Sequence, residues 1–272
     1  MLARRTSWPI VWPAACAFAV LLVASTGPAQ VIRETTVVPP EVTPPPIEPK
    51  WPPSKPFSTP GPSPVGLAWD GHYFWVSDSQ TRRIYRLDPT TGEWDPGLDW
   101  RGRLVGPITW DGKGIWVVDE GRGVIESIDP TSPEAARSSV PIPPAALWRP
   151  RAITGLVWDG RTLWLCTEGG LCASYYRIDV TSGRVLQSFF PRCEPRGLAF
   201  DGSYLWTIGY NGPRRPPRMS RRLLTDDPLS VLTSLSFLWL VPAHDPTALA
   251  LANGRFWVVD RSQRILFSVA AR

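Results

Sequence analysis

The sequence predicts an all-β protein, a five-bladed β-propeller whose blades are four-stranded antiparallel sheets. Three observations lead to this prediction. A pattern of apolar strand, Asp-Gly or Asn-Gly turn and second apolar strand occurs five times, tryptophans recur within it at regular spacing, and the last copy stops before its outer strand. A closed ring needs that outer strand, so an N-terminal strand is expected to supply it.

The first 30 residues have the features of a signal peptide. Arg4 and Arg5 precede an apolar run over residues 14–24, and small residues follow this run. The run is shorter than the roughly 20 apolar residues that a membrane-spanning helix needs. We therefore expect export to the periplasm or out of the cell, with no stable membrane span after cleavage. An uncleaved anchor is the alternative.

The charge of the exported chain is modest. The whole sequence has 29 basic and 24 acidic residues, and removal of Arg4 and Arg5 with the signal peptide leaves 27 and 24, a net charge of +3. Such a balance does not indicate a nucleic-acid partner. The expected partner is instead a protein, a polysaccharide or an anionic small molecule, and the chain is expected to be a monomer.

Residues 31–64 are predicted to be a proline-rich linker. Twelve prolines occur in the 26 residues from Pro39 to Pro64, a composition typical of extended chain. Within the linker, residues 55–60 stand at the distance before the first repeat that suits an outer strand, and we expect them to close the ring. The segment 31–38 is the alternative closing strand. The propeller itself is predicted over residues 65–272.

The five repeats are most easily followed by a tryptophan in the second strand of each copy. These marker tryptophans are separated by 41, 48, 42 and 51 residues, close to the roughly 40 to 50 residues of a propeller blade. They are Trp75, Trp116, Trp164, Trp206 and Trp257. The turns before them are Asp70-Gly71, Asp111-Gly112, Asp159-Gly160, Asp201-Gly202 and Asn253-Gly254. These dipeptides predict hairpins with positive φ at both turn residues.

The innermost strands are expected to begin with small residues. Gly66, Gly155, Gly197 and Ala248 stand at this position in four of the copies. Small side chains there suit strands that crowd around a central axis.

The repeats GLAWDG and IYRLDPTTG resemble those of the NHL-like and YWTD-like groups of bacterial secreted propellers. This resemblance implies the propeller fold over roughly residues 55–272. It implies no single activity, because these groups include binding modules, lactonases and lyases.

We name the strands of each blade A to D from the axis outward. Strand alternation then places the B–C and D–A loops on one rim, here called the loop rim, and the Asp-Gly turns on the other, the turn rim. Candidate ligand-binding residues on the loop rim are Asp78, Asp119, Glu120, Glu168, Asp260, Tyr210, Arg192, Arg196 and Trp148. The carboxylates are predicted either to bind a ligand at the channel mouth or to cap their own loops through backbone N–H groups.

The function expected from these residues is that of a binding or interaction module acting through the loop rim. The alternative is a propeller enzyme, similar to a lactonase, a lyase or a glutaminyl cyclotransferase, and the sequence does not decide whether the protein is an enzyme. Its catalytic candidates are Glu168, Asp119, Asp260 and His244. No cofactor is predicted, with a site for Ca²⁺ or Zn²⁺ as the alternative.

Three cysteines remain after export, and a disulfide between Cys172 and Cys193 is expected, with Cys166–Cys172 as the alternative pairing. A zinc site of the three thiols and His244 is a further alternative. Five arginines are expected in a basic loop of the fourth repeat on the loop rim. They are Arg214, Arg215, Arg218, Arg221 and Arg222.

Overall fold

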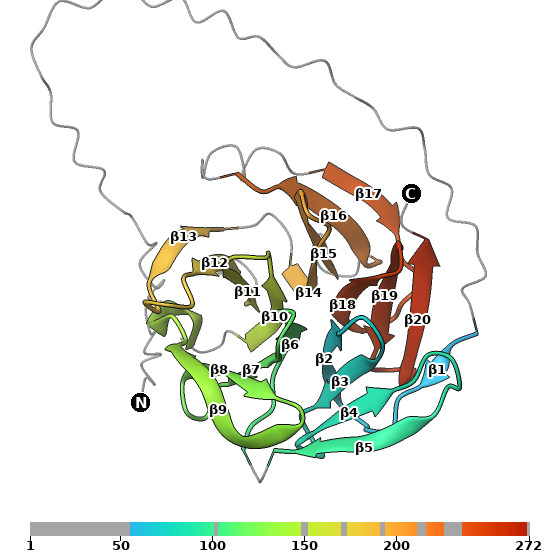
Figure 1. Cartoon of the computed structure of the whole chain (residues 1–272). Helices are drawn as coiled ribbons and strands as arrows, with labels where there is room; N and C mark the ends of the chain where they lie inside the picture. Colours follow the sequence, from blue (N-terminus) through green and yellow to red (C-terminus); the bar gives the residue numbers. More distant parts are fainter. Residues whose placement is uncertain are drawn as a thin grey trace, which may run out of the picture. The chain divides into compact units, whose positions relative to one another are not determined.

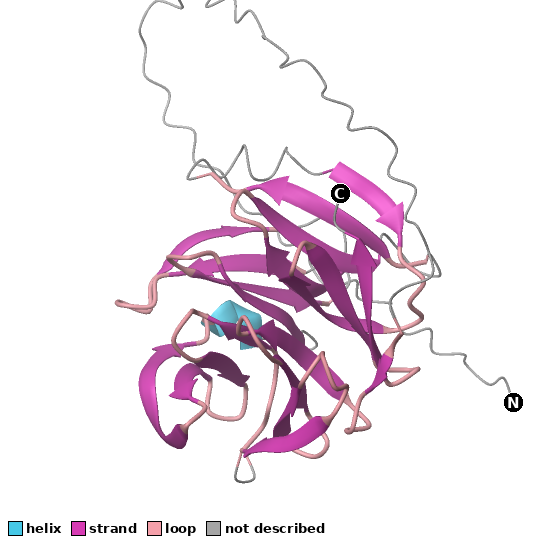
Figure 2. Cartoon of the chain, turned by 45° about the vertical axis from the view of Figure 1, so that its right-hand side comes forward, coloured by secondary structure: helices cyan, strands magenta, loops and turns pink. Residues whose placement is uncertain are grey.

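The computed structural model describes residues 55–100, 103–147, 152–169, 173–190, 194–210, 216–225 and 236–270, and it confirms the five-bladed propeller (Figure 1). These residues form strands and loops, with one 3₁₀ turn, η1, at Pro144–Leu147 (Figure 2). They contain no helix long and apolar enough to span a membrane. The expected signal peptide and the segment 31–38 lie outside the described residues.

Each blade is a four-stranded antiparallel sheet in which the strands follow one another from the axis outward. Blade one is β2 (Pro64–Trp69), β3 (Phe74–Asp78), β4 (Arg83–Leu87) and β5 (Trp94–Asp99). Blade two is β6 (Ile108–Trp110), β7 (Ile115–Asp119), β8 (Val124–Asp129) and β9 (Ser132–Pro141). Blade three is β10 (Ala152–Trp158), β11 (Leu163–Glu168), β12 (Ser174–Ile178) and β13 (Val185–Phe189). Blade four is β14 (Glu194–Phe200), β15 (Tyr204–Tyr210), β16 (Arg218–Leu223) and β17 (Ser236–Leu240).

Blade five takes its outer strand from the N-terminal side of the chain, as predicted. Its strands are β18 (Pro246–Ala252), β19 (Arg255–Asp260), β20 (Ile265–Ala270) and β1 (Phe57–Ser58). Phe57 pairs with Leu266 and Ser58 with Ile265, so β1, blue in Figure 1, lies beside β20, red. The ring of Phe57 stacks on Trp257 with the centroids 6.0 Å apart. The first and last parts of the propeller are therefore joined within one sheet.

The small residues at the start of the inner strands allow neighbouring blades to approach at the axis. A Cβ atom added to Gly66 would lie 2.7 Å from the backbone nitrogen of Ile108, and one on Gly197 would lie 2.7 Å from that of Leu249. Both positions therefore require glycine. Side-chain hydroxyls also link blades, since Thr247 Oγ1 donates to the Pro64 carbonyl at 2.8 Å and thereby joins blade five to blade one.

The Asp-Gly turns differ from the predicted type in four blades. Among the described residues only Asn253 and Gly254 have positive φ at both turn positions, at 50° and 70°. In blade one, Asp70 forms a longer turn, closed by its N–H donating to the carbonyl of Tyr73 at 3.2 Å. The prediction was wrong there because the Asp side chain stabilises this longer turn: Oδ1 accepts the N–H groups of His72 and Tyr73, each at 2.7 Å.

The second carboxylate oxygen of the same Asp holds the marker tryptophan. Four indole N–H groups donate to this oxygen over 2.6 to 2.9 Å. The pairs are Trp75–Asp70, Trp116–Asp111, Trp164–Asp159 and Trp206–Asp201. The repeated turn and the repeated tryptophan are thus one unit, which fixes strand B against the turn rim.

The described part of the basic loop predicted in blade four is mostly strand. Arg218, Arg221 and Arg222 belong to β16, where strand alternation buries Arg222 to 2% exposure. The guanidinium of Arg221 lies 4.5 Å from the ring centroid of Tyr204. The prediction of a loop was wrong for these three arginines, because the long side chains of Arg221 and Arg222 pack against aromatic rings. Arg214 and Arg215 lie outside the described residues.

Candidate functional site

A channel along the propeller axis is lined by the inner strands β2, β6, β10, β14 and β18. At the loop rim it opens into a cavity of about 210 Å³, called here the mouth pocket. Farther in, where Gly66, Gly155 and Gly197 meet Ala248, only about 10 Å³ of space remains. At the turn rim the channel opens again into a cavity of about 120 Å³. The two openings are therefore separated by a constriction.

The mouth pocket brings together four charged side chains, two of each sign and each from a different blade. They are Glu120, Glu168, Arg196 and Arg261. Its apolar lining includes Val65, Val105, Ala152 and Ile153, and three hydroxyls are contributed by Ser79, Thr154 and Thr247. An apolar wall with a few convergent polar groups is typical of a binding pocket.

The central contact of the pocket joins blades three and four. Arg196 Nη1 lies 2.6 Å from Glu168 Oε2, and both side chains keep about a quarter of their surface exposed. Burial raises the pKa of Glu168, and it prevails over the opposing effect of the Arg196 charge. Glu168 therefore takes up a proton more readily than an ordinary glutamate.

Arg196 retains donors that Glu168 does not use. A guanidinium has five N–H donors, whereas the Nε of Arg196 is buried without a hydrogen-bond partner in the described part of the chain. The guanidinium also lies 5.5 Å from the ring centroid of Tyr210. The Tyr210 hydroxyl donates to the His244 carbonyl at 2.9 Å, and burial raises the pKa of this hydroxyl. The ring of Tyr210, itself held by this hydrogen bond, therefore packs against the guanidinium of Arg196.

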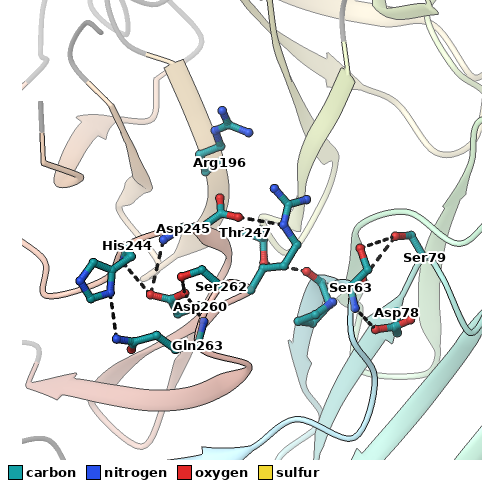
Figure 3. A network of polar contacts seen from close by, with 12 residues as sticks. Ser63, Asp78, Ser79, Arg196, His244, Asp245, Thr247, Asp260, Ser262 and Gln263 are labelled. Carbon is teal, nitrogen blue, oxygen red and sulfur yellow. Dashed lines mark hydrogen bonds and ion pairs between the residues drawn. The ribbon is translucent and has the colours of Figure 1, made fainter. Parts of the chain in front are cut away.

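Asp78 and Asp260 hold the loops of the rim in place (Figure 3). Asp78 Oδ2 accepts the N–H of Ser63 at 2.6 Å, and its Oδ1 accepts the N–H of Thr81 at 2.7 Å. Asp260 Oδ2 accepts the N–H of His244 at 2.6 Å. Each carboxylate therefore ties the loop that enters its blade to the loop that follows strand B, which is the loop-capping role that the sequence left as one of two interpretations.

Asp119 occupies the same position in blade two but is less completely bonded. Its Oδ1 accepts the N–H of Arg122 at 3.1 Å, whereas its buried Oδ2 has no hydrogen-bond partner within the described ranges. The side chain is 1% exposed and does not line the mouth pocket.

Hydrogen bonds hold the pKa of Asp260 below its ordinary value. Burial alone would raise this pKa, but the donors of Ser262, His244, Gln263 and Asp245 together outweigh it. The ionised carboxylate therefore stabilises the folded protein above the ordinary aspartate pKa of about 3.9, and this contribution is lost as the pH falls through the lower folded-state pKa.

We expect Asp260→Asn to lower the free energy of unfolding at neutral pH by about 1 to 3 kcal/mol, because buried N–H groups lose a charged acceptor. Denaturant melts of the wild type and the variant should converge between about pH 5 and pH 2, where the wild type loses its ionised group. Asp99→Asn, at a side chain that is 63% exposed, is the matched control and should change stability by less than about 0.5 kcal/mol. A difference between wild type and Asp260→Asn that does not vary with pH would contradict this role.

Of the residues predicted from sequence, the mouth pocket joins Glu120, Glu168 and Arg196, with Tyr210 beside them. His244 is exposed, and its ring nitrogen Nδ1 lies 2.8 Å from Gln263 Nε2. Trp148 and Arg192 lie outside the described residues. Sequence reasoning missed Arg261, although Ser79, Glu120 and Arg261 share one position, directly after strand B of their blades. This repeated position was the signal that could have found it.

Both predicted disulfides include a residue outside the described ranges, Cys172 or Cys193, so the pairing of the cysteines stays a prediction. Cys166 itself is buried in β11, with its Sγ 3.5 Å from Thr154 Oγ1. Within those residues, no three His, Cys, Asp or Glu side chains are grouped so as to hold a metal ion.

Comparison with known proteins identifies relatives in fold. No family model and no curated protein sequence matches the chain. The glutaminyl cyclase of Myxococcus xanthus is similar in structure, with a TM-score of 0.58 at 11% identity over 80% of this chain and 94% of that chain. A chain of the nidogen/laminin complex has a TM-score of 0.49 at 16% identity, over 72% of each chain. Virginiamycin B lyase of Staphylococcus aureus has a TM-score of 0.46 at 17% identity, over 76% of this chain and 66% of that chain.

These likenesses show the fold alone. The similar structures include β-propellers that bind proteins and β-propellers that are enzymes, and their identities to this chain are all below 20%. Function therefore has to be argued from the mouth pocket itself.

Proposed function

We propose that the protein is an exported binding module whose ligand enters the mouth pocket. The observation that carries this proposal is the convergence of Glu120, Glu168, Arg196 and Arg261, from four blades, on one cavity of about 210 Å³. Charges of both signs favour a ligand that is itself dipolar. Arg196 and Arg261 would bind a ligand carboxylate, and a ligand ammonium or amide N–H would donate hydrogen bonds to the two glutamates.

The size of the pocket limits what can enter. At roughly 30 Å³ for each water, the cavity holds about seven waters, which suits a free amino acid or the end of a peptide. The apolar lining next to the charges would receive a side chain. We therefore propose a small molecule or chain end with an amino-acid-like pattern of charge as the ligand, outside the cytoplasm.

Thermal melts of the full chain test this proposal. We expect glutamine or glutamate to raise the melting temperature more than acetate or methylammonium. Acetate can pair only with the arginines of the pocket, and methylammonium only with its glutamates. At ten times Kd the stabilisation is about 1.4 kcal/mol, or about 3 to 6 °C for a domain of this size. Arg196→Gln should abolish the rise, because it removes the charge that holds the ligand carboxylate.

Arg83→Gln is the matched control, because Arg83 also forms an ion pair, 3.4 Å from Asp99, but on the outer part of blade one. It should leave the rise unchanged. The proposal fails if none of the four probes raises the melting temperature, or if the rise survives Arg196→Gln.

A second candidate is an enzyme in which Glu168 transfers a proton. Burial beside the pocket raises the pKa of Glu168, and this favours the role, because a general acid or base works best when its pKa lies near the ambient pH. One reaction of this kind is cyclisation of an N-terminal glutamine. Its amine nitrogen bonds to the side-chain amide carbon, the bond to the amide nitrogen breaks, and the amine proton leaves with ammonia. Release of ammonia from glutaminyl-alanine, lost in Glu168→Gln, would favour the enzyme over the simple binding module.

A further inference from the structure

The opening of the channel at the turn rim is surrounded by large apolar side chains. Each inner strand has such a residue at its last or second-to-last position, one from each blade, and all five are half-buried and line the same cavity of about 120 Å³. We call this set the aromatic collar. Its members are Trp69, Trp110, Trp158, Phe200 and Leu251.

The collar residues are held by the blades but are not enclosed by them. Each packs against the core between two blades, and its cross-strand partner is buried, as with Trp110 opposite Ile115 and Trp158 opposite Leu163. The marker tryptophans, in contrast, donate their indole N–H groups to aspartates and lie within the core. Three partly exposed indoles therefore lie around one cavity whose accessible surface is more polar than apolar.

The same cavity also presents hydrogen-bonding groups of the backbone. The inner strands β2, β6, β10, β14 and β18 are each the edge of their sheet, so among the described residues no strand pairs with them on the axis side. Residues 67–69, 156–158, 198–200 and 249–251 line the cavity together with Thr109 and Trp110. A ligand in the collar therefore meets aromatic surfaces and backbone donors and acceptors at once.

The charges beside the collar are balanced. The turn aspartates Asp70, Asp111, Asp159 and Asp201 are already bonded to their own turns and tryptophans. Basic residues follow three of the five turns: Lys113, Arg161 and Arg255. This arrangement gives little preference for a cation, and a purely apolar ligand would leave the backbone groups of the edge strands desolvated without partners.

We propose that the aromatic collar binds a single sugar ring, either a free monosaccharide or the end of a glycan. A sugar ring is neutral, offers apolar C–H faces to the indoles and carries hydroxyls for the backbone edges. At roughly 30 Å³ for each water, the cavity has room for about four waters, so it would take one edge of a pyranose ring while the rest of the ring lies in the opening. The constriction of about 10 Å³ separates this site from the mouth pocket, so the two sites act independently.

Fluorine NMR of the full chain labelled with 5-fluorotryptophan tests the proposal. Glucose, galactose and N-acetylglucosamine are the sugar probes, and Trp→Phe variants assign the resonances. We expect at least one sugar to shift the resonances of Trp69, Trp110 and Trp158 while leaving that of Trp94, on an outer strand, in place. Trp158→Leu should weaken the binding by about tenfold, because it removes one stacking surface. Trp94→Leu is the matched control and should not change it.

If Trp158→Leu does not fold, Trp110→Phe serves in its place, because it keeps an aromatic ring while altering the stacking surface, and it should weaken binding by a smaller factor. A trisaccharide that binds more tightly than its monosaccharide indicates the end of a glycan, and equal binding indicates a free sugar. Arg196→Gln should leave the sugar-induced shifts unchanged, which separates this site from the mouth pocket. The proposal is overturned if no sugar shifts the collar resonances at high millimolar concentration, or if only tetramethylammonium or benzyl alcohol does so.

Discussion

Trp164→Ala is expected to lower the free energy of unfolding by about 3 to 5 kcal/mol, the usual cost of removing a large buried aromatic side chain. Trp164 is fully buried, and its indole N–H donates to Asp159 at 2.9 Å. Its ring also lies near that of Phe189, with the centroids 6.1 Å apart. The substitution therefore leaves a cavity between strands and removes the bond between strand B and its turn.

Urea melts measure this loss, and Trp94→Ala provides the comparison. Trp94 is half-buried at the start of the outer strand β5, so its loss should cost less than half as much. Asp159→Asn separates the hydrogen bond from the cavity, since it keeps the volume and weakens the acceptor. A loss below about 1 kcal/mol for Trp164→Ala would contradict the packing described.

Removal of β1 is the second change with a large expected effect. A chain that begins at Pro64 should lose at least about 3 kcal/mol of stability relative to one that begins at Lys55. It lacks Phe57, which stacks on Trp257, and it lacks the Ser63 N–H that Asp78 accepts at 2.6 Å. It also leaves β20 as an open edge, so we expect association that increases with protein concentration.

Chains that begin at residue 31, at Lys55 and at Pro64 can be compared in the same denaturant melts. The chain from Lys55 should match the chain from residue 31, because the closing strand is Phe57–Ser58. Phe57→Ala in the longest chain should reproduce part of the loss. Equal stability of all three chains would contradict the closure of the ring by β1.

The features that sequence reasoning predicted correctly are mostly local. A hairpin forms within a few residues, so the five turns and the marker tryptophans were visible in the sequence. The closing strand was predicted from its distance to Gly66, because a ring imposes a fixed order on its strands. The turn type was wrong because two neighbouring residues were considered, whereas the Asp70 side chain bonds two further residues of the turn and the tryptophan of the next strand.

Contacts between blades were harder to predict. Glu168 and Arg196 were both named as candidates, but their ion pair depends on how blade three faces blade four. The aromatic collar was missed because Trp69, Trp110 and Trp158 fit the apolar pattern of a buried strand equally well. Only the assembled ring of blades shows that this position lines an open cavity. The periodicity of a strand gives the face on which a side chain lies but not its distance to the channel axis.

An NMR titration that locates the binding site of a dipolar ligand tests the proposed function most directly. The Nε–Hε resonances of the arginine side chains can be followed by NMR while glutamine is added to the full chain. We predict that the resonances of Arg196 and Arg261 shift together with one Kd, because both line the mouth pocket, while those of Arg83 and Arg86 on blade one stay in place. Shifts at Arg83 or Arg86 without any at Arg196 and Arg261 would contradict the mouth pocket as the binding site.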